Sequence, residues 1–292
     1  MDQFLQQMVN GISLGSIYAL IALGYTMVYG IIKLINFAHG DVYMIGAYVG
    51  FAATTYARLG FLPALVISMI SCAVLGIVIE KVAYKPLRLS SRIAVLITAI
   101  GVSLLLEYVM MFFVGAEVRS YPKVLSDAAI TLGSVRISMQ QIYIIVTAIA
   151  LMVLLQFIVH KTKTGKAMRA VSIDADAAQL MGIRVDKTIS FTFAIGSAFA
   201  GAAGVLVGIY YNSIDPLMGV MPGLKAFVAA VFGGIGSIPG AMIGGLSIGI
   251  METMVSGYGN SMYRDAAVFA FLIIILIFKP AGLLGKNTRE KV

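Results

Sequence analysis

The sequence predicts an all-α membrane protein whose chain crosses the bilayer several times. Of its 292 residues, 60% are hydrophobic and 12% are charged, about half the charged share of a typical soluble domain. Apolar runs at residues 93–114, 138–160 and 264–280 approach or exceed the roughly 20 residues that a helix needs to cross a hydrocarbon layer. Segments of about ten residues with alternating polarity, which mark membrane β-barrels, are absent. We therefore expect a polytopic α-helical protein.

Nine apolar segments are candidate spans. They cover residues 4–31, 35–57, 61–80, 93–114, 138–160, 188–212, 219–234, 240–257 and 264–280. If 35–57 or 219–234 re-enters the membrane instead of crossing it, the count falls to eight. We expect about eight to nine transmembrane helices in a single domain over residues 1–292.

The basic residues predict the orientation of these spans. Most of them fall in three groups: Lys81, Lys85, Arg88 and Arg92; then Lys161, Lys163, Lys166, Arg169, Arg184 and Lys187; and finally Lys279, Lys286, Arg289 and Lys291. Loops rich in Lys and Arg stay in the cytoplasm, which predicts a cytoplasmic C-terminus and, with three spans before residue 81, an external N-terminus. Because topology explains the net charge of +8, no nucleic-acid partner is expected.

Small residues recur at four-residue spacing in two places. One stripe is Gly196, Ala200, Gly204 and Gly208, and the other is Gly236, Gly240 and Gly244, with Gly245 and Gly249 repeating the pattern. Small residues at this spacing let helix backbones approach closely, since packing drives helix association in lipid. We expect close helix contacts at both stripes.

The segment 115–138 is the one sizeable loop expected on the external side. It contains a proline, serines and charges of both signs. These residues fit two roles equally well: a docking surface for an external partner, or a solvated connector.

The sequence lacks the common motifs of covalent chemistry and nucleotide hydrolysis. GxxxxGK[ST], CxxC and HExxH do not occur. His39 and His160 are far apart in sequence, and the single cysteine, Cys72, lies in an apolar span, where a small core residue is expected. We therefore expect no catalytic site, no metal site and no cofactor.

The longest polar passage is the predicted cytoplasmic loop at about residues 161–187. Asp174 is a favourable N-cap for a short helix over 175–181, and Gly182 is a favourable stop. One mildly apolar face is expected from Met168, Val171, Ala175, Ala178 and Met181. Such an element either packs or docks against a partner, or lies along the lipid headgroups.

Several stretches resemble one family of transport proteins. DAAQLMGI at residues 176–183 resembles the EAAxxxG motif of ABC-importer permeases, with Asp in the place of Glu. GSIYALIALGYTMVYGIIKLINFAHGDVYMIGAY, NSIDPLMGVMPGLKAFVAAVFGGIGSIPGAMIGG and FKPAGLLG resemble the LivH-type permeases of branched-chain amino-acid importers. The resemblance extends over essentially the whole chain.

The resemblance implies the ABC-importer permease fold, a place in the inner membrane and no enzymatic activity. The chain would be the membrane-spanning subunit of an ATP-driven importer of branched-chain or related hydrophobic amino acids. The implied partners are a second permease of LivM type, two ATP-hydrolysing subunits and an extracytoplasmic amino-acid-binding protein.

The resemblance also implies that the polar passage couples the permease to the ATPase. The coupling motif would comprise Gly165, Lys166, Ala167, Met168, Arg169, Ala170, Val171, Ser172, Ile173, Asp174, Ala175, Asp176, Ala177, Ala178, Gln179, Leu180, Met181, Gly182 and Ile183. Asp176 keeps the charge of the family's Glu on a shorter side chain, so one contact is expected to be weaker or rearranged.

Five polar residues within or between the spans are candidates for the transport pathway: Asn36, His39, Asp41, Glu107 and Glu252. Ionisable groups inside spans cost roughly 2.5–3.5 kcal/mol or more at mid-helix, so they suggest function. The carboxylates could instead pair with Lys225 or carry a proton. The segment INFAHGD is either an unwound stretch lining a cavity or a cytoplasmic turn.

Two alternatives remain open from the sequence. A permease for urea or short amides shares the same architecture. A secondary transporter would need no ATPase and would use Glu107, Asp41 or Glu252 as ion sites near broken helices.

Overall fold

A computed structural model describes residues 2–88, 90–126 and 128–285. The basic residues Lys286, Arg289 and Lys291 lie outside the described residues. The helices are α1 (Asp2–Ile32), α2 (His39–Thr55), α3 (Phe61–Ile79) with the π-turn η1 (Glu80–Tyr84) and the 3-10 turn η2 (Lys85–Leu87), α4 (Arg92–Val114), α5 (Met139–Lys161), α6 (Lys163–Ile173), α7 (Ala175–Leu180), α8 (Val185–Tyr211), α9 (Val220–Gly233), α10 (Ile238–Tyr258), η3 (Ser261–Tyr263) and α11 (Arg264–Phe278).

Four short strands complete the secondary structure. β1 (Arg119–Ser120) pairs antiparallel with β4 (Ser213–Ile214). β2 (Ala129–Leu132) and β3 (Val135–Ser138) form a hairpin. Within the described residues, seven helices are long and apolar enough to cross a membrane. The predicted all-α polytopic fold is therefore confirmed.

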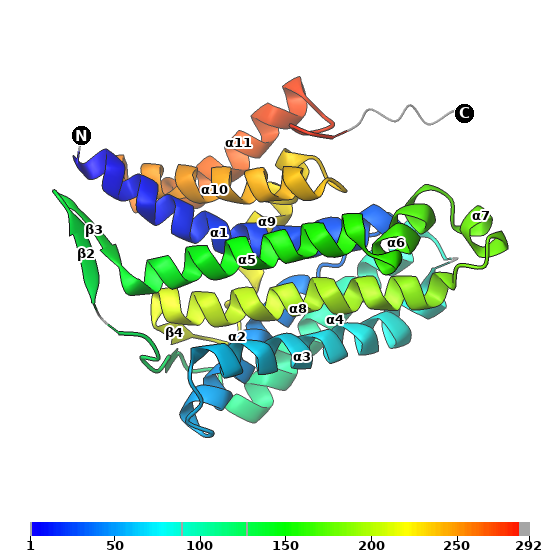
Figure 1. The fold of residues 1–292 in the computed structure, drawn as a ribbon, viewed down its shortest axis with the longest axis horizontal. Helices are drawn as coiled ribbons and strands as arrows, with labels where there is room; N and C mark the ends of the chain where they lie inside the picture. Colours follow the sequence, from blue (N-terminus) through cyan, green and yellow to red (C-terminus); the bar gives the residue numbers. More distant parts are fainter. Residues whose placement is uncertain (1, 89, 127, 286–292) are drawn as a thin grey trace.

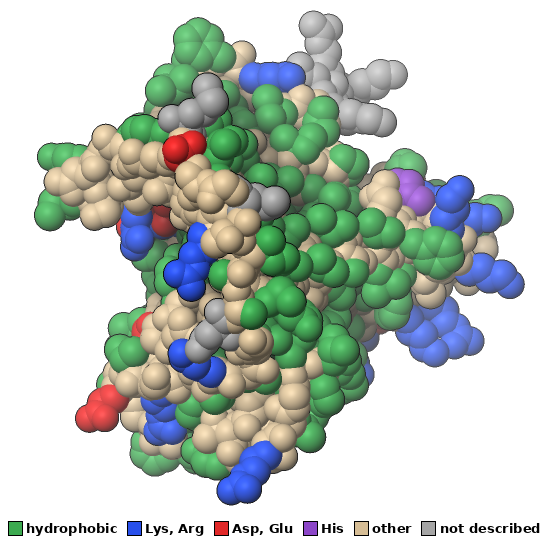
Figure 2. Space-filling model, turned by 60° about the vertical axis from the view of Figure 1, so that its left-hand side comes forward, with side chains coloured by type: hydrophobic (Ala, Val, Ile, Leu, Met, Phe, Trp, Pro, Cys, Tyr) green, Lys and Arg blue, Asp and Glu red, His purple; other side chains and the backbone are tan. Residues whose placement is uncertain are grey.

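The long helices run side by side along the long axis of the molecule (Figure 1). The N-terminus and the β2–β3 hairpin lie at one end, which we call the hairpin end. α6 and α7 project at the opposite end, the α7 end. Between the two ends, hydrophobic side chains cover much of the flank (Figure 2), as a bilayer-embedded surface requires.

The small-residue stripes bring helix backbones into contact, as predicted. In α10, Gly245 packs on Ala19 of α1, and Gly249 packs on Gly15. A Cβ atom added at Gly249 would lie 2.7 Å from the carbonyl oxygen of Gly11, closer than a carbon atom can sit without displacing the backbone. α8 uses its stripe in the same way against α1 and α2. These contacts make α1 and α8 the centre of the bundle.

Two helices begin inside the bundle, and they are the two that the sequence singled out, α2 and α9. His39, the first residue of α2, packs against Gly24 of α1, which in turn packs on Gly196 of α8. Gly196 lies about 16 Å along α8, a helix of about 40 Å, so α2 begins near mid-depth. α9 begins at the same level, since a Cβ atom added at Gly223 would lie 3.1 Å from the Cα atom of Gly40.

α2 and α9 run from this level to opposite ends of the molecule. α2 reaches the hairpin end, where the Phe51 ring lies 6.2 Å from that of Tyr121 beside β1. α9 ends at the α7 end, where Gly233 packs against Gly240 at the start of α10. A non-helical segment precedes each of these helices inside the bundle. It comprises residues 33–38 before α2 and residues 215–219 before α9.

We predict opposite effects for two matched glycine substitutions. Gly249→Ala lowers the stability by about 1–3 kcal/mol, because the methyl group has no room against α1. Gly101→Ala on α4, where an added Cβ meets nothing within 4 Å, leaves it unchanged or raises it by up to about 1 kcal/mol through helix propensity. Thermal unfolding of the detergent-solubilised protein measures both, and equal midpoints for the two variants would contradict the packing account.

Candidate functional site

The polar passage forms two helices at the α7 end. The Asp174 side chain accepts hydrogen bonds from the backbone N–H groups of Asp176 (3.0 Å) and Ala177 (2.9 Å), so the predicted N-cap of the short helix is confirmed. Gly182 has a φ of +83°, the left-handed conformation that ends helices and favours glycine. The structure therefore agrees with the predicted bounds of this helix to within one residue.

The predicted apolar face of this passage is only partly correct. Met168 and Val171 of α6 and Ala178 of α7 are buried, but Ala175 and Met181 are exposed. The reason is that Asp174 has an extended backbone, with φ −154°, which ends α6 and turns α7 in a new direction.

The tip of this projection carries exposed apolar side chains. Ile173, Leu180 and Met181 are 87%, 89% and 83% exposed, while Lys and Arg side chains gather on the projecting end seen at the right of Figure 2. Exposed apolar residues with a polar rim mark interaction sites. The α7 tip therefore has the character of a docking surface.

Ion pairs join the start of α8, directly after this projection, to the end of α3. The Asp186 carboxylate pairs with Lys85 (2.6 Å) and Arg88 (2.7 Å). Arg88 also pairs with the fully buried Glu80, which accepts a hydrogen bond of 2.6 Å from the Ser190 hydroxyl. Two of the basic residues predicted from topology thus hold α8 against η1 and η2.

One hydrogen bond continues this connection toward the centre of the molecule. The Tyr84 hydroxyl, in η1, donates to the side-chain oxygen of Asn36 at 2.9 Å, and both residues are buried. Asn36 lies in the non-helical segment 33–38, which leads into α2. A continuous set of contacts therefore runs from the α7 end to the mid-depth start of α2.

A cavity lies where α2 and α9 begin. It has a volume of about 160 Å³ and is lined by Tyr25, Phe37, Gly40, Asp41, Ile100, Ser103, Leu104, Glu107, Gly219, Val220, Gly223 and Leu224. These residues come from α1, the segment before α2, α2, α4, α9 and the residue preceding α9. The cavity thus combines two carboxylates with an otherwise mostly apolar wall.

The structure separates the five candidate pathway residues. Asp41 and Glu107 line the cavity. Asn36 is buried in the segment 33–38 that leads to it, and His39 is buried at the start of α2. Glu252 lies elsewhere. Its carboxylate pairs with Lys225 at 2.8 Å and accepts a hydrogen bond from the Tyr18 hydroxyl at 2.8 Å.

The Lys225 ammonium joins three helices. Besides Glu252 of α10, it contacts Asp265 of α11 at 2.6 Å, while Lys225 itself lies on α9. Lys225 and Glu252 are both buried. Glu252 is therefore paired with Lys225, which is one of the possibilities that the sequence left open.

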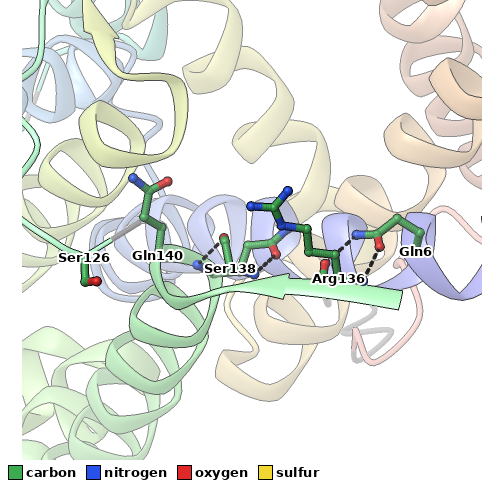
Figure 3. A pocket seen from close by; sticks show the side chains of 6 residues that line it. Gln6, Ser126, Arg136, Ser138 and Gln140 are labelled. Atoms are coloured by element: carbon green, nitrogen blue, oxygen red, sulfur yellow. Dashed lines mark hydrogen bonds between the residues drawn. The ribbon is translucent and has the colours of Figure 1, made fainter. Parts of the chain in front are cut away.

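A second pocket lies at the hairpin end and is polar (Figure 3). It has a volume of about 470 Å³ and is lined by Gln6, Ser126, Arg136, Ser138, Gln140 and Gln141. The Gln6 side chain donates to the Arg136 carbonyl (3.0 Å) and accepts from the Arg136 backbone N–H (2.9 Å). These two bonds fix the hairpin to α1, so the pocket has a defined shape.

Comparison with known proteins identifies the family. Residues 7–278 match the family model described as "Branched-chain amino acid transport system / permease component". The chain is 46% identical to the high-affinity branched-chain amino acid transport system permease protein LivH of Escherichia coli K12, over 99% of this chain and 98% of that protein.

The chain belongs to this permease family. The permease is also 44% identical to BraD of Pseudomonas aeruginosa, over 99% of its own length and 98% of that relative. A solved structure, PsaBC from Streptococcus pneumoniae in complex with Fab, aligns with a TM-score of 0.50 and 15% identity, covering 95% of this chain and 92% of that one. This last likeness supports the fold alone.

Sequence reasoning missed several residues of the permease that the structure brings together. Ser103, whose hydroxyl donates to Asp41 at 2.5 Å, stands in the sequence as an isolated hydroxyl in an apolar helix and gives no signal. Glu80 and Tyr84 could have been noticed, because a lone acidic residue precedes a group of basic ones in EKVAYKPLR. In the described part of the chain, no group of three or more His, Cys, Asp or Glu side chains could hold a metal ion.

We predict that Asp174→Ala loosens α7 of the permease. Removing an N-cap costs about 1 kcal/mol, so the backbone amides of residues 175–180 should exchange with deuterium about fivefold faster. Gln179→Ala, on the exposed face of the same helix, is the control and leaves the exchange unchanged. Equal exchange in both variants would show that Asp174 does not hold the helix.

Proposed function

We propose that this chain is the membrane-spanning permease subunit of an ATP-driven importer of branched-chain amino acids. The observation that carries the proposal is the family match over residues 7–278, together with 44–46% identity to LivH and BraD over nearly the full length of each chain. The whole chain, residues 1–292, forms one permease domain. ATP hydrolysis belongs to separate partner subunits.

The two ends of the molecule suit different partners in this proposal. The α7 end, with the motif from Gly165 to Ile183, faces the cytoplasm and docks on an ATPase subunit through the exposed side chains of Ile173, Leu180 and Met181. The described chain ends on that side of the bundle as well (Figure 1), which supports a cytoplasmic C-terminus. The hairpin end faces outward, and its polar pocket offers a surface to an external binding protein. A LivM-type permease completes the membrane part.

The amino acid crosses near the mid-depth cavity between α2, α4 and α9. Non-helical backbone at membrane depth is tolerated only where it is buried in protein or lines a cavity, and transporters place their substrate sites at such broken helices. Asp41 and Glu107 face the pathway, while Asn36 and His39 support the segment that closes it from the α7 end. Glu252 pairs with Lys225 and stabilises the packing of α10 against α9.

The ion-pair cluster at the α7 end transmits motion to this cavity. When the ATPases close, they displace α6 and α7, and with them the start of α8. Asp186 and Ser190 pass the displacement to η1 through Arg88 and Glu80, and Tyr84 passes it to Asn36. The segment 33–38 then moves relative to α9.

Reconstitution tests the proposed function directly. We expect leucine uptake into proteoliposomes only when both permeases, the ATPases, internal ATP and the binding protein are present. The buried carboxylates beside broken helices also fit a secondary transporter. Leucine uptake by this chain alone on an ion gradient would favour that class and refute the present proposal.

The docking role of the α7 end is tested by two variants with matched controls. We predict that Asp176→Lys and Gly182→Leu impair co-purification of the ATPase while the permease still inserts into the membrane. Glu117→Lys makes the same charge change on the opposite end. Gly133→Leu makes the same substitution at a positive φ of +64° in the hairpin turn.

Both controls should retain the ATPase, since they lie at the hairpin end. Normal co-purification in Asp176→Lys and Gly182→Leu would remove the coupling assignment.

A further inference from the structure

The mid-depth cavity has a charge pattern of its own, which the transport role does not by itself explain. Asp41 is 2% exposed and Glu107 is 8% exposed, and both line the cavity. Their carboxyl groups lie side by side. Asp41 accepts a hydrogen bond from the Ser103 hydroxyl, but among the described residues no Lys or Arg forms an ion pair with either carboxylate.

This arrangement differs from the other buried carboxylates of the bundle. Glu80 has Arg88, and Glu252 has Lys225. A buried carboxylate without a cation is costly, because desolvation removes its interaction with water, and the hydrogen bond from Ser103 to Asp41 replaces only part of it. A cationic group that enters the cavity would supply the missing partner to Asp41 and Glu107.

The amino ends of two helices meet at the cavity, and of these only that of α2 already carries a carboxylate, Asp41, in its first turn. α2 and α9 both begin there, at Gly40 and at Gly219 with Gly223. The first backbone N–H groups of a helix point toward its amino end, where the helix dipole favours an anionic group. α9 has 14 residues, long enough to make this effect substantial at its amino end. The cavity therefore offers a site for a cation and a site for an anion within one small volume.

The rest of the wall is apolar. Phe37, Ile100, Leu104 and Leu224 line it. The volume of about 160 Å³ resembles the engineered cavity of about 150 Å³ that holds one benzene molecule, so one small molecule fits. A zwitterion with a short apolar side chain matches all three parts of the wall.

We propose that this cavity is a substrate subsite in which Asp41 and Glu107 bind the α-ammonium group of the transported amino acid. Its α-carboxylate lies at the amino end of α9, and its side chain lies between Phe37, Leu104 and Leu224. This inference rests on the proposed function, because it takes the transported molecule to be an amino acid. It adds that the permease itself recognises the ammonium group.

The first experiment measures transport and ATP hydrolysis together in the assembled transporter. Asp41→Asn and Glu107→Gln should each lower leucine uptake by about tenfold or more, as expected when one member of a buried charge pair is lost. ATP hydrolysis stimulated by the binding protein should change less than about twofold, since docking and coupling are intact. Tyr108→Phe, next to Glu107 on α4 but 65% exposed and outside the cavity lining, should retain uptake.

Uptake by both cavity variants close to that of the unaltered transporter overturns the subsite. Absence of leucine uptake by the unaltered transporter refutes the proposed function instead, so the two failures are distinguishable. If the variants do not assemble, a second measurement decides the question without requiring transport.

That measurement labels an introduced thiol after the single native cysteine has been removed. In a Cys72→Ala background, Leu224→Cys places one thiol in the cavity wall of the assembled complex. Each labelling rate is divided by the rate of the same reagent with a free thiol in solution. On this scale the cationic reagent 2-aminoethyl methanethiosulfonate should react about tenfold faster than its anionic 2-sulfonatoethyl counterpart, because the two carboxylates attract the cation. Leucine should slow the labelling, whereas 4-methylpentanoate, which lacks the ammonium group, should not.

Equal rates for the two reagents overturn the proposal, as does equal protection by 4-methylpentanoate. Protection by sodium or potassium chloride as strong as that by leucine would identify an inorganic-cation site instead and would also overturn it.

Discussion

The meeting of two helix starts halfway through the bundle is the constraint on which the rest of the structure depends. α2 and α9 approach each other through Gly40, Gly219 and Gly223, with no side chain between the backbones. The buried His39 side chain packs against Gly24 of α1 and holds α2 at that depth. Because both helices begin there, a cavity remains beside α4. Non-helical backbone with free polar groups also lies inside the bundle, which uninterrupted helices would not provide.

The position of this junction explains how distant parts of the chain act together. The α7 end is separated from the cavity by half the length of α8, too far for direct contact. Packed, hydrogen-bonded elements can carry a displacement over that distance when each link has few alternative partners. Arg88, Glu80 and Tyr84 form such links, and they end at Asn36, inside the non-helical segment 33–38 that joins α1 to α2.

The spans and the capping of α7 could be predicted from sequence because they depend on local signals. Apolar length defines α3, α4 and α5 to within a few residues, and Asp174 and Gly182 define α7. The depth of α2 and α9 could not be predicted, since it is set by glycine contacts between segments more than 150 residues apart in the chain, such as Gly46 with Gly201 and Gly40 with Gly219. Of the candidate pathway residues, only Asp41 and Glu107 reach the cavity, because pairing depends on which helices become neighbours.

The buried ammonium of Lys225 has a consequence for how the protein is made. α9 is short and carries a charge whose partners, Glu252 and Asp265, are synthesised after it. An unpaired Lys at the centre of a membrane helix costs roughly 2.5–3.5 kcal/mol. We therefore expect α9 to be stable in its final position only once α10 and the start of α11 have been synthesised and supply Glu252 and Asp265. The segment from α9 to α11, which begins at residue 220 of 292, is therefore stabilised in the bundle as one unit.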